Sequence, residues 1–234
     1  MSLNRKRLFF SGLAGTGKSY LISRLNPSVN WHLLDPGREL VALLVPQLQE
    51  VIYQKNTWSR EFGLWIGHLG RGWRLATDFD PTRVLGTAFF RFVGSLVSPN
   101  NAKIQAADWT KFGNDDFWVN AAIAGTSNLP KDQLVTIDSV RADVDQERLR
   151  QAGWTHVHVL CDPATRLKRI LTKETILPDT SDQSEKLGHK LDRLVVENKR
   201  DDPSFPDVVV WTGEEQFKPA RALLPDAFVS WVLD

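Results

Sequence analysis

Short apolar runs alternate along this chain with longer segments in which apolar residues recur at helical spacing. Five runs are apolar on both faces and rich in β-branched or aromatic residues, as strands covered on both sides are. These strand predictions are Leu8–Ser11, Trp31–Asp35, Leu134–Asp138, Val157–Cys161 and Val208–Trp211. The helix predictions are Lys18–Leu25, Arg38–Ile52, Pro81–Val97, Asp115–Ala124, Val144–Ala152 and Ala164–Thr175. This alternation predicts an α/β fold with a doubly wound parallel sheet, which binds ligands at the carboxyl ends of its strands.

Two long intervals interrupt the alternation. Residues 53–130 are rich in Trp and Gly and offer no convincing central strand, so we expect a mostly helical insertion that builds the substrate side of a cleft. Residues 178–206 are polar and charged, which predicts a mobile lid or an extended loop. Together with the helix that precedes it, this stretch forms a lid-like segment at about 163–206. A chain of 234 residues then suits a single domain, 1–234, with one insertion and one lid.

Composition narrows the class of protein. The chain has 29 Lys and Arg residues and 28 Asp and Glu residues, so its net charge is close to zero. This net charge gives no reason to expect nucleic acid or a membrane as a partner. Cys161 is the single cysteine, which excludes an internal disulfide framework and suits a reducing compartment. The apolar run near the N-terminus is too short for a membrane span or a signal peptide. We therefore expect a cytoplasmic enzyme.

The strongest chemical signal is the stretch that follows the first predicted strand. It matches G-x-x-x-x-G-K-[ST] and comprises Gly12, Leu13, Ala14, Gly15, Thr16, Gly17, Lys18 and Ser19. Glycines let successive N–H groups point inward at an anion, and the helix that begins there adds its positive end. Lys18 is expected to reach the β- and γ-phosphates of ATP, and Ser19 to ligate Mg²⁺. The nucleotide-binding set also includes Tyr20, the next residue.

A phosphate-binding loop does not by itself separate kinases from other nucleotide-binding proteins. The third predicted strand ends at Asp138, and Arg141, Asp145 and Gly153 follow it. With this spacing the chain resembles the phage-type deoxynucleoside monophosphate kinases, a branch of the P-loop nucleoside monophosphate kinase-like proteins. Ser139 stands where that family usually has an acid, and Asp138 would substitute by one register.

Two further segments are similar to the same family. Leu34–Leu40 looks like the segment after its second strand, where a basic residue following a proline approaches the substrate phosphate, and Arg38 is the matching position. Asn114–Val119 is similar to its acidic and aromatic segment, which ends in Trp-Val and here includes Trp118. The resemblance touches most of the chain but is diffuse outside the glycine-rich stretch.

The resemblance implies a P-loop NTPase three-layer sandwich with a five-stranded parallel sheet. It also implies phosphoryl transfer from ATP to a deoxynucleoside monophosphate, with ATP and Mg²⁺ as cofactors. Arg38 and Arg141 would grip the acceptor phosphate, because a planar guanidinium binds phosphate bidentately. Asp35 and Trp118 complete the expected substrate-binding set. The alternative role for each arginine is a surface salt bridge. Trp65, Trp73 and Trp118 are the candidates for a surface on which a base stacks, and the alternative for any one of them is packing in the core.

Three residues complete the expected catalytic and metal sites. Arg166 and Arg169 follow Asp162-Pro163, which resembles the start of a lid helix whose arginines close over the donor phosphates. Lys18, Arg141 and Arg166 form the predicted catalytic set. Asp138 would orient the water ligands of Mg²⁺, and a helix N-cap is the alternative role for it.

Several acceptors of the phosphoryl group, and one class of protein other than a kinase, remain open. Phage kinases that act on a hydroxymethylated base within DNA have a similar core, and the tryptophan-rich insertion could hold an extruded base. A small phosphorylated metabolite is a further acceptor, since phosphomevalonate kinases also resemble this group. A partner-dependent ATPase or binding module is the non-kinase alternative. The free nucleotide remains the leading acceptor, and a homodimer is left open.

Overall fold

The chain divides into two compact units. The computed structural model describes residues 3–45, 81–96, 101–138, 140, 142–173 and 183–234. One unit is formed by Met1–Trp31 together with Pro130–Asp234, and the other by His32–Leu129. The second unit is therefore inserted between two parts of the first. The predicted helix end at Ile52, together with Trp65, Trp73 and Arg141, lies outside the described residues.

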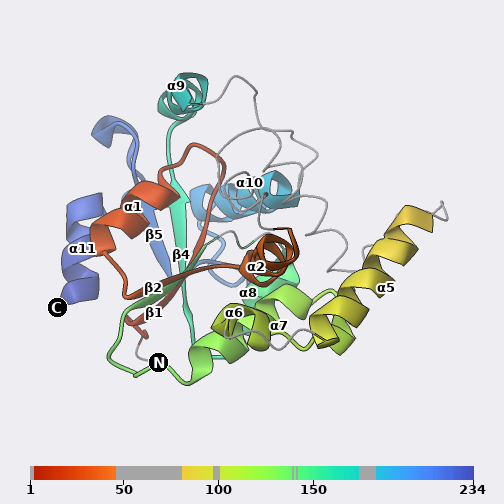
Figure 1. The fold of residues 1–234 in the computed structure, drawn as a ribbon. Coiled ribbons are helices and arrows are strands. Elements are labelled where there is room, and N and C mark those ends of the chain that lie inside the picture. Colours follow the sequence, from red (N-terminus) through yellow and green to blue (C-terminus); the bar gives the residue numbers. More distant parts are fainter. Residues whose placement is uncertain (1–2, 46–80, 97–100, 139, 141, 174–182) are drawn as a thin grey trace. The chain divides into compact units, whose positions relative to one another are not determined.

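A five-stranded sheet with the order β2-β3-β1-β4-β5 forms the centre of the first unit (Figure 1). Its strands are β1 (Arg7–Ser11), β2 (Val29–His32), β3 (Val135–Asp138), β4 (Thr155–Leu160) and β5 (Val208–Trp211). Strand β1 pairs in parallel with β3 on one side and β4 on the other, and β4 pairs in parallel with β5. Strands β3 and β4 thus lie on opposite sides of β1, and at such a point parallel α/β sheets commonly bind ligands at the carboxyl ends of their strands. The predicted α/β class with a parallel sheet is confirmed.

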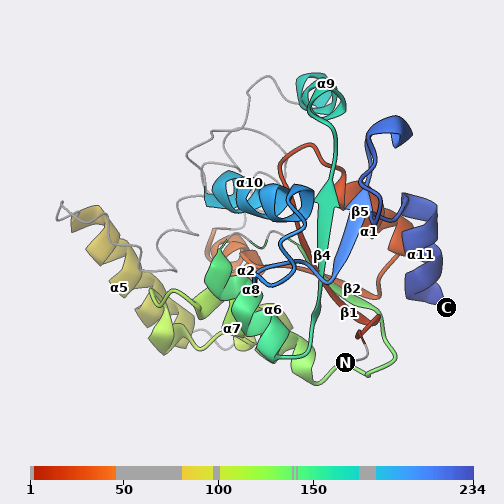
Figure 2. The same ribbon diagram turned by 180° about the vertical axis from the view of Figure 1, so that it is seen from behind.

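Helices cover both faces of the sheet (Figure 2). Alternation along β1 sends Leu8 and Phe10 to one face, where they pack with α1 (Lys18–Leu25) and α11 (Pro225–Leu233) in a fully apolar cluster. Phe9 and Ser11 point to the opposite face, which is covered by α8 (Asp143–Gln151) and α10 (Gln183–Val196). This second face is partly polar, and it carries the buried contacts described below. Helix α9 (Pro163–Lys173) follows β4.

The second unit is mostly helical over its described residues. Its helices are α2 (Asp35–Leu44), α5 (Pro81–Leu96), α6 (Ala102–Gln105), the short 3₁₀ turn η2 (Trp109–Lys111) and α7 (Phe117–Ser127). An aromatic cluster holds three of these elements together, with ring centroids 4.8 to 5.8 Å apart among Phe90, Trp109, Phe112, Phe117 and Trp118. Edge-to-face and offset stacking of this kind adds stability beyond the area buried.

The second strand and the helix after it begin earlier than predicted. The strand lies at Val29–His32 instead of Trp31–Asp35, and α2 begins at Asp35 instead of Arg38. Pro36 explains the shift, because proline at the start of a helix has a suitable φ and lacks only an N–H that would be unpaired there. The apolar pair Leu33 and Leu34 is buried without being in the strand.

The prediction of an extended loop over 178–206 is wrong for Gln183–Val196, which form helix α10. Leu187, Leu191 and Leu194 recur on one face of this helix and are between 0 and 7% exposed. Helix α11 and the 3₁₀ turn η3 (Glu215–Phe217) were also not predicted. None of the helices in the described ranges is both long and apolar enough to cross a lipid bilayer.

Candidate functional site

The glycine-rich loop, Gly12–Ser19, joins β1 to α1 at the carboxyl end of the central strand. Its glycines Gly12, Gly15 and Gly17 all have positive φ angles, of 137°, 78° and 93°. At Gly12 the chain also passes so close to β4 that a Cβ atom would lie 2.5 Å from the carbonyl oxygen of Val159. The loop path therefore depends on glycine, as the sequence predicts for a backbone that curls around an anion.

The side chain of Lys18 folds over this loop. Its ammonium group donates hydrogen bonds to the carbonyl oxygens of Gly12, at 2.6 Å, and of Leu13, at 2.8 Å. The hydroxyl of Thr16 donates to the same Leu13 oxygen at 2.9 Å. A positive charge thus sits at the N-terminal end of α1, where the helix dipole also favours an anion. Ser19 and Tyr20 follow in the first turn of α1, and both are exposed.

Two arginines from one face of α9 reach the loop. The Arg166 Nε donates to the carbonyl oxygen of Ala14 at 2.7 Å. Arg169 donates to the hydroxyl of Thr212 at 3.1 Å and to its carbonyl oxygen at 2.6 Å, beside Gly17. Lys168, which lies between them in sequence, is exposed. Both arginines predicted from the lid resemblance are therefore placed at the glycine-rich loop.

Asp162 begins α9 as a structural cap. Its carboxylate accepts hydrogen bonds from the backbone N–H groups of Thr165, at 2.8 Å, and Glu214, at 3.0 Å. Burial works to raise the pKa of this carboxyl, but the backbone hydrogen bonds outweigh it and leave the pKa below its ordinary value. The ionised cap fixes the start of α9, and with it the direction in which Arg166 and Arg169 extend.

The oxygen atoms available near the loop fit Mg²⁺. Asp138 is half-buried at the end of β3, and because Ile137 pairs with Phe9, it lies beside β1 just before the loop. Its alternative role as a helix N-cap is wrong, since α8 begins at Asp143 with Ala142 in the cap position. Within the described ranges no three His, Cys, Asp or Glu residues cluster as a metal cage. Mg²⁺ suits such a place, because it usually takes one or two protein oxygens and completes its shell with water and phosphates.

The other family-like positions near β3 have structural roles. Asp145 accepts a hydrogen bond from the N–H of Ala142 at 3.2 Å and so stabilises the start of α8. Gly153 ends the same helix with a φ of 80°. An acid at the start of a helix and a left-handed glycine at its end are ordinary helix signals. Their spacing from Arg141 is therefore accounted for by helix α8.

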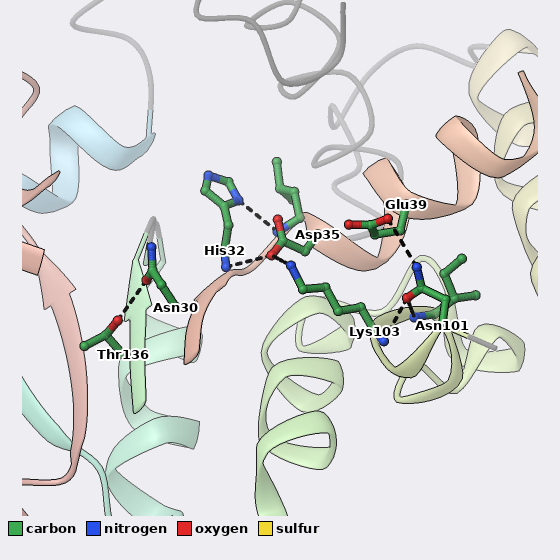
Figure 3. A network of polar contacts seen from close by, with 9 residues as sticks. Asn30, His32, Asp35, Glu39, Asn101, Lys103 and Thr136 are labelled. Atoms are coloured by element: carbon green, nitrogen blue, oxygen red, sulfur yellow. Dashed lines mark hydrogen bonds and ion pairs between the residues drawn. The ribbon is translucent and has the colours of Figure 1, made fainter. Parts of the chain in front are cut away.

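Three of the predicted acceptor residues, Asp35, Arg38 and Trp118, lie in the second unit. Figure 3 shows the Asp35 carboxylate in a polar network, where it accepts hydrogen bonds from the His32 N–H at 3.2 Å and the Lys103 ammonium at 2.5 Å. Asp35 is 5% exposed, so the ion pair with Lys103 neutralises it inside the unit. The Arg38 Nε is buried and has no hydrogen-bond partner among the residues that the structure describes. A buried N–H without a partner is costly and suits a group that binds a ligand.

Trp118 is a core residue of the second unit. It is 0% exposed, and the rings of Phe112 and Phe117 contact it edge-on with centroids 5.6 and 4.8 Å away. No face of the ring is open to a nucleobase. The expectation of a stacking surface at this residue is corrected accordingly, because the aromatic cluster encloses the ring.

Sequence reasoning missed a buried polar network directly below the loop. Ser11, His156 and His158 are between 0 and 2% exposed on the face of the sheet that α8 and α10 cover. The Ser11 hydroxyl lies 2.6 Å from the His156 Nε2 and 2.8 Å from the His158 Nδ1. Arg150 on α8 lies 3.0 Å from the His156 Nδ1, and Asp192 on α10 lies 2.8 Å from the His158 Nε2.

The two ends of this network fix the proton on the His156 ring and the proton on the His158 Nε2. Arg150 can only donate, so the His156 Nδ1 accepts and its Nε2–H donates to Ser11. At the other end of the network, the His158 Nε2–H donates to the carboxylate of Asp192. The chain of hydrogen bonds is complete only with His156 neutral. It ties the last residue of β1, immediately before Gly12, to helix α10.

The protonation state of His156 makes stability depend on pH. Burial lowers its pKa well below the ordinary value of 6.5, and the charges of His158 and Arg150 lower it further. Above pH 6.5 both folded and unfolded chains hold this histidine neutral. Below that pH only the unfolded chain takes up the proton, so each further pH unit should cost about 1.4 kcal/mol of folding free energy, until the folded pKa is reached. Urea unfolding between pH 5 and 8 measures this slope.

His156→Gln keeps a donor and an acceptor but cannot titrate, so its slope below pH 6.5 should be shallower by up to one proton. His189, exposed on α10, provides the matched control as His189→Gln. An unchanged slope for His156→Gln, or the same loss of slope in both variants, would contradict a neutral His156.

The first unit therefore gathers three cations around one backbone loop: Lys18, Arg166 and Arg169. Inward-curling amides, a helix N-terminus and guanidinium groups are the means by which proteins bind phosphate. Comparisons with protein-family models, with curated proteins and with solved structures found no match for this chain. The functional proposal consequently depends on the chemistry of the loop.

Proposed function

We propose that this protein is a P-loop kinase that transfers the terminal phosphoryl group of Mg²⁺-ATP to a deoxynucleoside monophosphate. The observation that carries the proposal is the glycine-rich loop at the carboxyl end of the central strand, with Lys18 folded over it and Arg166 and Arg169 beside it. The strand order supports it, since the loop lies where connections diverge and open α/β sheets bind ligands.

Each residue of the donor site has a role in this reaction. The loop amides and Lys18 hold the β- and γ-phosphates, and the arginines of α9 offset charge that spreads over the transferred group. Ser19 and Asp138 would hold Mg²⁺, directly and through water, and the metal neutralises phosphate charge when bound. An oxygen of the acceptor phosphate forms the new P–O bond as the bond to the β-phosphate oxygen breaks, which yields ADP and a nucleoside diphosphate.

Arg38 is the proposed contact for the acceptor phosphate. Its partnerless Nε in the second unit supports this assignment, because a phosphate oxygen would satisfy the buried N–H. Arg141 is proposed for the same role from the family resemblance. Such an enzyme would work in the cytoplasm, where its nucleotide substrates are made.

ADP release from Mg²⁺-ATP by the purified chain tests the proposal. We expect at least one of the deoxynucleoside monophosphates to stimulate release above the rate without acceptor. DNA that contains hydroxymethyluracil and small phosphorylated metabolites are the other arms of the assay. Stimulation only by DNA or only by a metabolite would replace the acceptor class, whereas release that no acceptor stimulates would leave an ATPase and overturn the kinase.

A further inference from the structure

Helix α10 packs against the glycine-rich loop through residues at helical spacing. Glu185, Gly188 and Asp192 recur at intervals of three and four and so share one face of the helix. Gly188 allows the close approach, since a Cβ atom there would lie 2.6 Å from the Leu13 side chain and 3.2 Å from its backbone nitrogen. Asp192 joins the buried network that begins at Ser11. The helix is thus fixed to the strand and to the loop at once.

Glu185 is the member of this face that contacts the predicted donor site. It is 4% exposed, and its carboxylate accepts a hydrogen bond from the Ala14 N–H at 2.8 Å. The other carboxylate oxygen accepts from the Arg166 guanidinium at 2.5 Å. Arg166 in turn donates to the Ala14 carbonyl oxygen at 2.7 Å. Glu185 and Arg166 together therefore hold both backbone groups of Ala14, a residue in the middle of the loop.

A buried carboxylate beside a phosphate-binding loop needs a physical reason. Burying it without a partner would be strongly unfavourable, and near bound phosphates it would also repel them. Both costs are offset here by the ion pair with Arg166, whose side chain is 20% exposed and keeps N–H groups available. A long arginine side chain loses considerable rotamer freedom when it is held in one place. Because Glu185 already holds Arg166, this entropy is lost when the protein folds and not when a ligand binds. The site is therefore preorganised.

We propose that Glu185 is a positioning residue of the donor site, which acts by holding Arg166, and the loop backbone at Ala14, in the geometry that binds the ATP phosphates. This inference depends on the proposed nucleotide site. Glu185 touches no reacting atom and works through Arg166. The interaction between the two residues should therefore appear as coupling in ATP affinity, and not merely as a loss of stability.

A double-mutant cycle tests the proposal. Mg²⁺-ATP binding is measured by calorimetry for the wild type, Glu185→Gln, Arg166→Ala and the double variant, with thermal unfolding of all four. We expect Glu185→Gln to weaken ATP binding about tenfold when Arg166 is present and less than twofold when it is absent, a coupling typical of residues in contact. Glu197→Gln, the same substitution at the exposed surface after α10, is the control and should bind like the wild type.

Two outcomes of the cycle would overturn the proposal. Equal weakening in both backgrounds would show that Glu185 acts independently of Arg166, and tighter binding by Glu185→Gln would make the carboxylate a competitor of phosphate. If Glu185→Gln does not fold, Glu185→Asp keeps the charge but shortens the side chain, and it should lose ATP affinity by a similar factor. ATP binding by a wild type without kinase turnover would remove the kinase proposal alone, while absence of ATP binding would remove both.

Discussion

Lys18→Ala should lose at least about a hundredfold in acceptor-dependent ADP release while the protein stays folded. The size of the loss follows from other enzymes, in which one removed donor to the charged transition state costs about 10²–10³ in turnover. The Lys18 ammonium donates hydrogen bonds to the loop carbonyl oxygens of Gly12 and Leu13. Its removal exposes these carbonyls to water and leaves the apolar core unchanged. Steady-state kinetics and circular dichroism measure the two effects.

A matched variant separates the role of Lys18 from its charge. Lys168→Ala removes the same charge from an exposed position on α9, between the two arginines that face the loop. We expect it to retain turnover within about twofold, because distant surface charges are screened by salt. Full activity of Lys18→Ala would show that the donor phosphates are bound elsewhere.

The sheet and the loop could be predicted because their signals are local. Val208–Trp211 and Lys18–Leu25 have the same bounds in the prediction and in the structure. The strand is a short apolar run between polar segments, and the helix follows a glycine-lysine-serine sequence that has one well-understood conformation. By contrast, β2 was misplaced because Leu33 and Leu34 extend its apolar run, although both are buried outside the strand.

Helix α10 was missed because burial of its apolar face depends on what lies opposite. Three leucines and the terminal pair Val195 and Val196 are the apolar residues of this helix, and the polar residues Glu185 and Asp192 are also turned inward. From the sequence alone, Glu and Asp residues are expected to be exposed, because a charged side chain is buried only where a partner pairs with it. Those partners, Ala14 and His158, come from other segments of the chain, and Ala14 lies 171 residues from Glu185.

The same reasoning explains which site residues were found. Arg166 and Arg169 could be predicted because they follow Asp162-Pro163, a local signal that resembles the start of a lid helix. The network of Ser11, His156 and His158 could not, because Ser11 and His158 are 147 residues apart and meet only through the pairing of β1 with β4. Its single local signal was the spacing of the two histidines, which places them on the same face of one strand.

Gly12→Ala should lower the free energy of unfolding by about 2–5 kcal/mol, from backbone strain and overpacking together. Its φ of 137° is rarely adopted by residues with a side chain, and the new Cβ atom would lie 2.5 Å from the Val159 carbonyl oxygen. Val159 cannot move aside easily, because it belongs to β4, which is paired on both sides in the centre of the sheet. The loop must shift instead, so ATP binding should be lost as well.

Gly153→Ala is the control that separates strain from collision. Gly153 also has a positive φ, of 80°, but a Cβ atom there would meet nothing within 4 Å. It should therefore cost only the strain of a left-handed residue, about 1 kcal/mol. Urea unfolding of both variants gives the two values, and calorimetry with Mg²⁺-ATP gives the affinities. Equal destabilisation by the two substitutions would mean that the loop does not pass against β4, and the close approach of Gly12 to the Val159 carbonyl oxygen would be wrong.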